Sequence, residues 1–343
     1  MTFKKLFKII GLTIASSSLP IIAISCNSSK EDNLENKVSE NKESKSTTEQ
    51  SNTPESNSTS EETKESNEDN LNISKKYVYD DTNDYYESAD GLSGQELLNE
   101  ITRIQKSHMK GIGTYNDLKK LYNTTNAFRD IYFEKDDTIL DVYSENPDGE
   151  DPYNFKEYMT KNGGREGDGT NREHIIPQSW FNKESPLRND GQFVWPTDIK
   201  VNNRRSNYPH GNVVEASYTS QNGSKLGTDS LKQTVFEPVD KFKGDIARAY
   251  LYFIATYNDK NILNRNSIFK NKFPYIDAFF LDVYRDWDKN DTVDIFDITR
   301  NNETAKFEEM RNPFIDYPNL YENIFGENPK PFHNKGVLVS IHE

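Results

Sequence analysis

A carboxylate, an imidazole, an amide and a guanidinium group lie close together in the sequence, at Glu173, His174, Asn202 and Arg205. Carboxylate and amide oxygens are hard ligands that hold Mg²⁺ or Ca²⁺, and water and phosphate oxygens complete the coordination. An imidazole that does not bind the metal can take a proton from water near neutral pH. Together these groups suit phosphoryl chemistry, in which a metal neutralises the charge that develops on the phosphate.

The surrounding sequence predicts a strand, a loop, a second strand and a helix. Apolar strands are expected at 173–176 and 192–195, and a proline directly follows each and should stop it. Thr197 is the expected cap of the helix, and Pro209 ends it. Asn202 and Arg205, three residues apart, should then share one helix face.

One geometric requirement follows from the adjacency of Glu173 and His174. Neighbouring residues on a regular strand point to opposite faces, so both could not line one site. We therefore expect an irregular strand at this point, which the glycine-rich segment 163–171 before it would permit.

Four segments resemble the bacterial endonuclease I family, the periplasmic and secreted DNA/RNA nucleases of the ββα-metal superfamily. The segments are NREHIIPQSWF, PTDIKVNNRRSNYPHG, FEPVDKFKGDIARAYLY and RNPFIDYP, and they occur in the order found in the family. The resemblance covers roughly residues 130–318. It implies an α+β fold in which a ββα-metal (His-Me finger) nuclease core is embedded in a mainly helical domain.

The resemblance also implies roles for three residues. His174 would be the catalytic general base, and Glu173 and Asn202 would hold one ion, Mg²⁺, with Ca²⁺ or Mn²⁺ as alternatives. The structural alternatives are a solvated edge charge at Glu173 and a helix-surface amide at Asn202. Their joint occurrence with Pro177 in the motif argues against both alternatives.

Further polar residues of the motifs are assigned to the same site. Arg205 and Asn207 would belong to the active-site helix, Arg205 as a catalytic residue and Asn207 in binding substrate phosphate. Arg172 is expected either to contact phosphate or to pair with an acid. Arg204 is left out, because it need not share the helix face of Asn202.

The other histidines lack this context. His210 follows the proline that ends the predicted helix and is either a site residue or a plain turn residue. His108, His333 and His342 are interpreted as surface residues. Many members of the family carry histidine where this chain has Gln192 and Phe193, so no role is transferred to that pair.

Two further helices are predicted as scaffold. Leu97, Leu98, Ile101 and Ile104 recur at helical spacing within 93–109, with Ser93 as the expected N-cap. Apolar residues recur in the same way over 243–257, which we expect to be the main core helix. Residues 311–318 suggest a turn closed by proline after a preceding helix.

The N-terminus has the layout of a secretory signal. Three lysines precede an apolar run over 9–24, and the segment ends at Cys26, the single cysteine of the chain. The ending Ala-Ile-Ser-Cys resembles a bacterial lipobox, which implies a signal peptide over 1–25 and a diacyl or triacyl anchor on Cys26, as in a mycoplasma-type membrane nuclease lipoprotein. A transmembrane helix is the alternative, but the run is interrupted and short for a span.

Composition divides the rest of the chain at residue 75. Residues 26–75 contain no aromatic residue and are rich in Ser, Asn, Glu, Lys and Thr, so we predict a lipid-anchored, disordered linker. Residues 76–343 contain all three tryptophans and should form one nuclease domain. The whole chain carries a net charge of −14, so phosphate must be bound by a local basic cluster.

The predicted function is a metal-dependent, largely sequence-nonspecific endonuclease. It would hydrolyse extracellular DNA, with RNA as a second or even the sole substrate, because phosphate-directed chemistry needs no contact with base edges. The alternative is a catalytically inactive surface lipoprotein that captures nucleic acid, which the acidic charge slightly favours. Intact Glu173, His174 and Asn202 count against it, since a binding protein has no use for a metal and a base.

Overall fold

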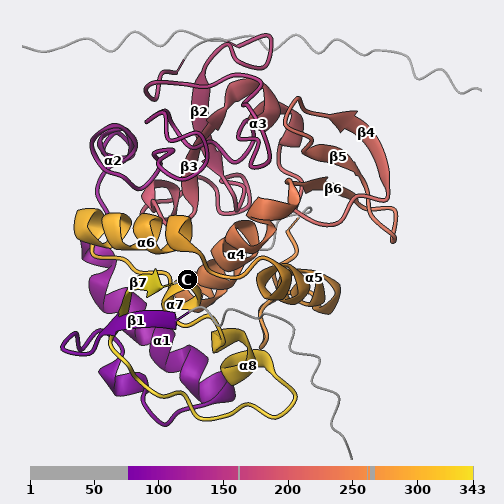
Figure 1. The fold of residues 1–343 in the computed structure, drawn as a ribbon. Coiled ribbons are helices and arrows are strands. Elements are labelled where there is room, and N and C mark those ends of the chain that lie inside the picture. Colours follow the sequence, from indigo (N-terminus) through magenta and orange to yellow (C-terminus); the bar gives the residue numbers. More distant parts are fainter. Residues whose placement is uncertain (1–75, 161–162, 261, 263–266, 343) are drawn as a thin grey trace, which may run out of the picture. The chain divides into compact units, whose positions relative to one another are not determined.

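A computed structural model describes residues 76–160, 163–260, 262 and 267–342. The chain divides into two units, residues 1–68 and 69–343, and all described residues belong to the second. The described part combines α-helices with small antiparallel sheets, so the predicted α+β class is confirmed (Figure 1). The predicted signal peptide, Cys26 and the predicted linker lie outside the described residues.

Helix α4 (Lys243–Tyr257) has the bounds that the sequence predicts and is buried along its whole length after Lys243. Helices α1 (Gly94–His108) and α5 (Ala278–Asn290) pack against it (Figure 1). Two charged residues of α4 are buried because they pair with α6 (Ile295–Glu308). Arg248 contacts Asp297 at 2.6 Å, and Asp245 contacts Arg300 at 2.7 Å. Asp245 and Arg248, the charged residues of the Lys-Gly-Asp-Ile-Ala-Arg segment that form these ion pairs, therefore link α4 to α6.

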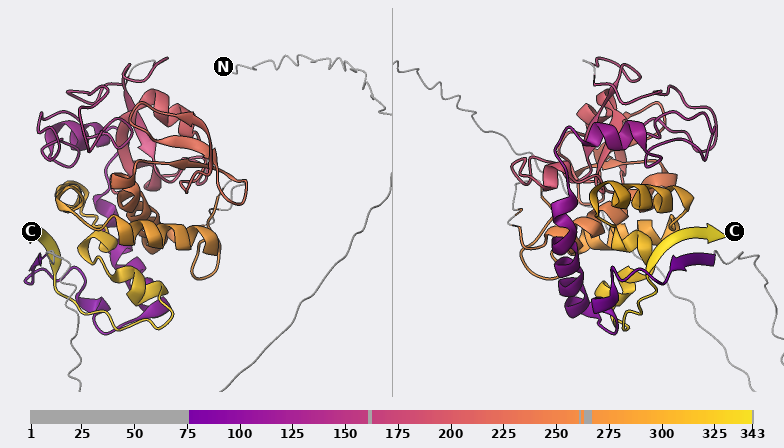
Figure 2. Two further views of the ribbon diagram at one scale, coloured as in Figure 1. Left: turned by 45° about the vertical axis from the view of Figure 1, so that its right-hand side comes forward. Right: turned by 90° about the vertical axis from the view of Figure 1, so that its left-hand side faces the viewer.

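The remaining elements surround this core. Strands β1 (Lys76–Asp80) and β7 (Val337–His342) come from opposite ends of the described chain and lie side by side, antiparallel (Figure 2). A second sheet has the order β4-β5-β6, at Glu215–Thr219, Lys225–Thr228 and Thr234–Glu237. The short helices are α2 (Leu118–Thr124), α7 (Pro313–Asp316) and α8 (Leu320–Phe325).

Strands β2 (Thr170–His174) and β3 (Val194–Asp198) form an antiparallel pair that leads into α3 (Ile199–Arg205). The predicted order of strand, loop, strand and helix is correct, but both strands are shifted along the chain. Strand β3 runs through Pro196, although the proline predicts that the strand ends there. Pro196 faces Arg172, whose backbone N–H and C=O bond to the side chains of Asn171 and Asn202, so the missing N–H of Pro196 leaves no gap in the ladder.

Helix α3 begins one residue later than predicted. Its N-cap is Asp198, whose Oδ1 accepts hydrogen bonds from the backbone N–H groups of Lys200 at 2.7 Å and Val201 at 2.8 Å. Thr197, the predicted cap, is instead a buried strand residue. Helix α1 begins directly after Ser93 as expected, although the Ser93 side chain makes no capping hydrogen bond.

Over the described residues, no helix combines the length and the apolar character that a membrane span requires.

Candidate active site

Helix α3 lies along the edge of β2 that does not pair with β3. The Asn202 amide donates through Nδ2 to the backbone oxygen of Arg172 at 3.2 Å. Arg205 donates through Nη1 to the backbone oxygen of His174 at 2.7 Å, and through Nη2 to that of Ile175. The helix face that carries Asn202 and Arg205 therefore faces the strand that carries Glu173 and His174, as their spacing predicts.

A pocket of about 360 Å³ opens where α3 meets β2. Tyr115 lines this pocket. The six residues predicted to act in catalysis, metal binding or phosphate binding also line it: Arg172, Glu173, His174, Asn202, Arg205 and Asn207. The structure thus brings together every predicted site residue within its described part.

The irregular strand expected at Glu173 and His174 is not found. The pairing of β2 with β3 runs from Thr170 to His174 without a register shift. Among the described residues β2 pairs only with β3, apart from one isolated bridge at Thr170. The expectation was wrong because it assumed a site on one face of a sheet, whereas side chains from both faces of a strand can reach a pocket at its open edge.

The carboxylate of Glu173 is almost fully buried and is held through one oxygen. Oε1 accepts a hydrogen bond from the Tyr143 hydroxyl at 3.0 Å and lies 2.9 Å from Nη1 of Arg205. Burial raises the pKa of Glu173 to about 7, although Arg205 and Tyr143 both favour the charged form. All of these contacts use Oε1, which leaves Oε2 for a ligand.

His210 lies behind Glu173 and completes this network. Its Nε2 is 2.9 Å from the Tyr143 hydroxyl, and its Nδ1 is 3.3 Å from Nη2 of Arg205 and from the hydroxyl of Tyr250. His210 is fully buried, so its interpretation as a plain turn residue is wrong. Tyr143 was missed, because a lone tyrosine thirty residues upstream of Glu173 carries no signal in the sequence.

His174 is held in a neutral form that suits a base. Its Nε2 lies 3.2 Å from the backbone oxygen of Arg188, which can only accept, so Nε2 carries the hydrogen and Nδ1 carries the free lone pair. Burial lowers the pKa of His174 to about 3, and the charges of Arg188, Arg205 and Arg172 act in the same direction. The imidazole is therefore unprotonated throughout the neutral range.

This neutral state predicts how stability changes with pH. Histidine in an unfolded chain has a pKa near 6.5, while His174 in the folded chain has a pKa of about 3. Between these values the unfolded chain binds a proton that the folded chain does not, so stability falls as the pH is lowered through this window. In EDTA, we expect the Tm of His174→Gln to fall less steeply from pH 6.5 to pH 4 than that of the wild type.

An exposed histidine offers a matched control for this measurement. His333→Gln should reproduce the wild-type slope, because His333 is exposed. Parallel curves for the wild type and His174→Gln would show that His174 is not held neutral by the fold.

Arg172 is a nearly buried cation that faces the pocket without an acidic partner. Its side chain is 9% exposed, and Nε and Nη2 have no hydrogen-bond partner among the described residues. The guanidinium lies 4.0 Å from the ring centre of Tyr115, and so does that of Arg188. Of the two roles considered for Arg172, pairing with an acid is not observed among the described residues, and contact with phosphate stays a prediction.

Several other residues have structural roles. The amide of Gln192 is buried and donates to Asn301 Oδ1 at 3.0 Å and to the backbone oxygen of Met310 at 2.7 Å. His333 and His342 are exposed as predicted, whereas His108 is half-buried and stacks on Tyr85. Arg204 is exposed and lies over Tyr218, away from the pocket.

Comparison with known proteins identifies the family of this chain and two similar proteins. The family model for Endonuclease I matches residues 93–319. The chain is 29% identical over 254 residues to an extracellular ribonuclease of Bacillus subtilis, covering 72% of this chain and 80% of the relative. It is 28% identical over 254 residues to an extracellular ribonuclease of Bacillus amyloliquefaciens, covering 71% of this chain and 79% of that relative.

Proposed function

Because this chain belongs to the endonuclease I family, we propose that it is a divalent-metal-dependent endonuclease that hydrolyses phosphodiester bonds of extracellular DNA and RNA. The observation that carries the proposal is the convergence of Glu173, Asn202 and a neutral His174 on one pocket. A carboxylate and an amide that can hold a metal ion, beside an unprotonated imidazole, are groups suited to metal-assisted hydrolysis of a phosphodiester.

The donors present fit a hard divalent ion. The hydrogen bond and the closest ion-pair contact of Glu173 both use Oε1, which leaves Oε2 for a ligand. The Asn202 amide is turned by its Nδ2 hydrogen bond to Arg172, which leaves Oδ1 for a ligand. One carboxylate, one amide oxygen and water suit Mg²⁺, with Ca²⁺ or Mn²⁺ as alternatives. When bound, the ion supplies charge neutralisation at the phosphate and the leaving oxygen. We propose that β2, β3 and α3 form a ββα-metal core around it.

The protein's own side chains would do the rest of the chemistry. Nδ1 of His174 would take the proton of the attacking water. Arg172 would bind a phosphate oxygen, and Asn207, which lines the same pocket, would bind the substrate backbone. Arg205 would act mainly by holding Glu173 and the backbone of His174 in place.

This arrangement favours low sequence specificity. The groups that line the pocket are suited to a phosphate and its leaving oxygen, which are common to every nucleotide and carry no sequence information. The alternative of an inactive surface protein that only captures nucleic acid has one supporting observation, the acidic net charge of −14. It gives no reason for a buried carboxylate and a neutral imidazole beside an unpaired arginine.

Cleavage of supercoiled plasmid and of a long single-stranded RNA tests the proposal directly. With Mg²⁺ we expect nicking and then fragmentation of the plasmid without preferred sites, and degradation of the RNA. EDTA should stop both reactions. Binding of either nucleic acid without any cleavage in Mg²⁺, Ca²⁺ or Mn²⁺ would support the inactive binding protein instead.

We also propose that residues 76–343 act as a secreted domain that is lipid-anchored through Cys26. The support is the lipobox-like ending at Cys26 and the similarity to two proteins described as extracellular ribonucleases. Cys26→Ala should move the protein from the detergent phase to the aqueous phase in detergent partitioning. Unchanged partitioning would mean that the N-terminal segment is held in the membrane in another way.

A further inference from the structure

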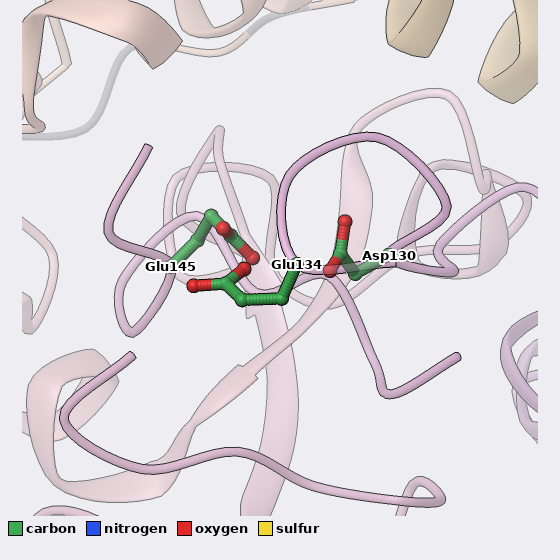
Figure 3. Close-up of side chains that lie close together, drawn as sticks. All are labelled: Asp130, Glu134 and Glu145. Atoms are coloured by element: carbon green, nitrogen blue, oxygen red, sulfur yellow. The ribbon is translucent and has the colours of Figure 1, made fainter. Parts of the chain in front are cut away.

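Three carboxylates gather at a place that is not part of the catalytic pocket. Asp130, Glu134 and Glu145 each offer one oxygen, and these oxygens all lie within 4.8 Å of one another. Figure 3 shows the carboxyl groups of Glu134 and Glu145 pointing toward each other, with Asp130 beside them. None of the three lines the pocket that contains Glu173, and none forms an ion pair among the described residues.

Glu145 is the member of this cluster that needs a partner. Its side chain is 1% exposed, yet neither of its carboxylate oxygens has a hydrogen-bond partner among the described residues. Burial, followed by the like charges of Asp151 and Asp130, raises the pKa of Glu145 to about 10. A buried carboxylate without a donor is costly, and such groups in native proteins either take up a proton or bind a cation.

Asp130 is held in position by the chain around it. Its Oδ1 accepts the backbone N–H groups of Tyr132 at 3.1 Å and Phe133 at 2.9 Å, and its Oδ2 accepts that of Lys135 at 2.9 Å. These bonds fix the carboxylate, and Oδ2, which accepts one of them, keeps a lone pair for a further ligand. Glu134 is exposed, so the cluster is open to solvent on its side.

We propose that Asp130, Glu134 and Glu145 bind a second divalent cation, Ca²⁺, independently of the catalytic metal. Three carboxylates with open access for water form an all-oxygen ligand set of the kind that Ca²⁺ prefers. No imidazole or thiol belongs to the cluster, which disfavours zinc. Mg²⁺ is disfavoured because it keeps most of its water and rarely takes three carboxylates from the protein.

The position of Glu145 gives the ion a structural role. Asp141, four residues earlier, accepts the backbone N–H of Asp198, the N-cap of α3, at 2.6 Å. Tyr143 on the same segment binds Glu173. An ion that ties Glu145 to Asp130 would therefore hold the segment that positions both the start of α3 and the Glu173 carboxylate.

Thermal unfolding of the full chain in Ca²⁺ and in EGTA tests this inference, with 10 mM Mg²⁺ throughout to occupy the catalytic site. At a Ca²⁺ concentration of about 100 times its Kd, the Tm of the wild type should rise by roughly 5 to 10 °C. Glu145→Gln should abolish this rise. In EGTA, the same variant should be at least as stable as the wild type, because it removes the uncompensated carboxylate.

A wild type that is the more stable protein in Ca²⁺ but not in EGTA, compared with Glu145→Gln, distinguishes a cation site from a side chain that is merely protonated. Glu150→Gln is the matched control, since Glu150 is exposed in the same region and its loss should leave the Ca²⁺ response unchanged. Should Glu145→Gln fail to fold, Glu134→Gln removes an exposed ligand and should raise the Kd for Ca²⁺ in calorimetric titrations at least tenfold. No Ca²⁺-dependent rise in the wild type, or an equal rise in Glu145→Gln, would overturn the proposal. Since plasmid cleavage is not measured, this outcome is separate from that of the proposed nuclease activity.

Discussion

His174→Ala should lower the rate of plasmid cleavage by roughly 100 to 10,000-fold, the usual effect of removing a general base. The imidazole is neutral, and its free nitrogen Nδ1 would take a proton from the attacking water. It is not among the proposed ligands, so the affinity for Mg²⁺ should stay nearly unchanged. Single-turnover rates over a Mg²⁺ titration, with metal binding followed by calorimetry, measure both quantities.

The two ligand variants provide the contrast. Asn202→Ala removes a neutral ligand, so its activity should fall but recover in part as Mg²⁺ is raised. Glu173→Ala removes the charged ligand and should recover less. If His174→Ala were the variant rescued by added metal, the imidazole would be a ligand, and a transition metal would replace Mg²⁺ in the mechanism.

Arg205→Met should cost about 3–5 kcal/mol of folding free energy, because it leaves the Glu173 carboxylate buried without its partner. Both side chains are only 1% exposed, and they lie 2.9 Å apart. The substitution also removes the donors to the backbone oxygens of His174 and Ile175. Urea unfolding in EDTA measures the loss, and cleavage should fall as well because Glu173 and His174 lose their support.

A second substitution separates the effect of the Arg205–Glu173 ion pair on stability from its effect on cleavage. Arg205→Met combined with Glu173→Gln should regain part of the lost stability, since no charge is then buried alone, yet it should stay inactive. Arg204→Met is the matched control, because Arg204 is adjacent to Arg205 in the chain but is exposed and does not line the pocket. A loss of stability in Arg204→Met as large as in Arg205→Met would contradict the assigned role of the buried pair.

Much of the site could be predicted from local sequence. The three-residue spacing of Asn202 and Arg205 is a property of any helix, and the two side chains do lie on the face of α3 that meets β2. Helix α4 was predicted to the residue because apolar side chains recur along it at helical spacing. These predictions depend only on interactions within one element, and the sequence contains all of the information that they require.

Other features were decided by contacts between distant segments. Strand β3 continues through Pro196 because the facing residue, Arg172, is bonded elsewhere, and this depends on which strand pairs with it and in which register. Glu173 and His174 share a pocket without a bulge because the second edge of β2 is left to α3. No local sequence pattern indicates that one edge of a strand such as β2 will be left without a pairing strand.

The buried partners were the hardest to predict. Tyr143 and His210 reach Glu173 and Arg205 from separate parts of the chain, and Glu145 meets Asp130 across a loop. A tyrosine or glutamate in the sequence carries no sign of burial, because its burial depends on what packs over it from elsewhere. The sequence by itself determined the residue types of the candidate site and the helix and strand that carry them, through local spacing. Only the tertiary structure decided which of their atoms remain free to react, because that depends on the partners that folding brings to them.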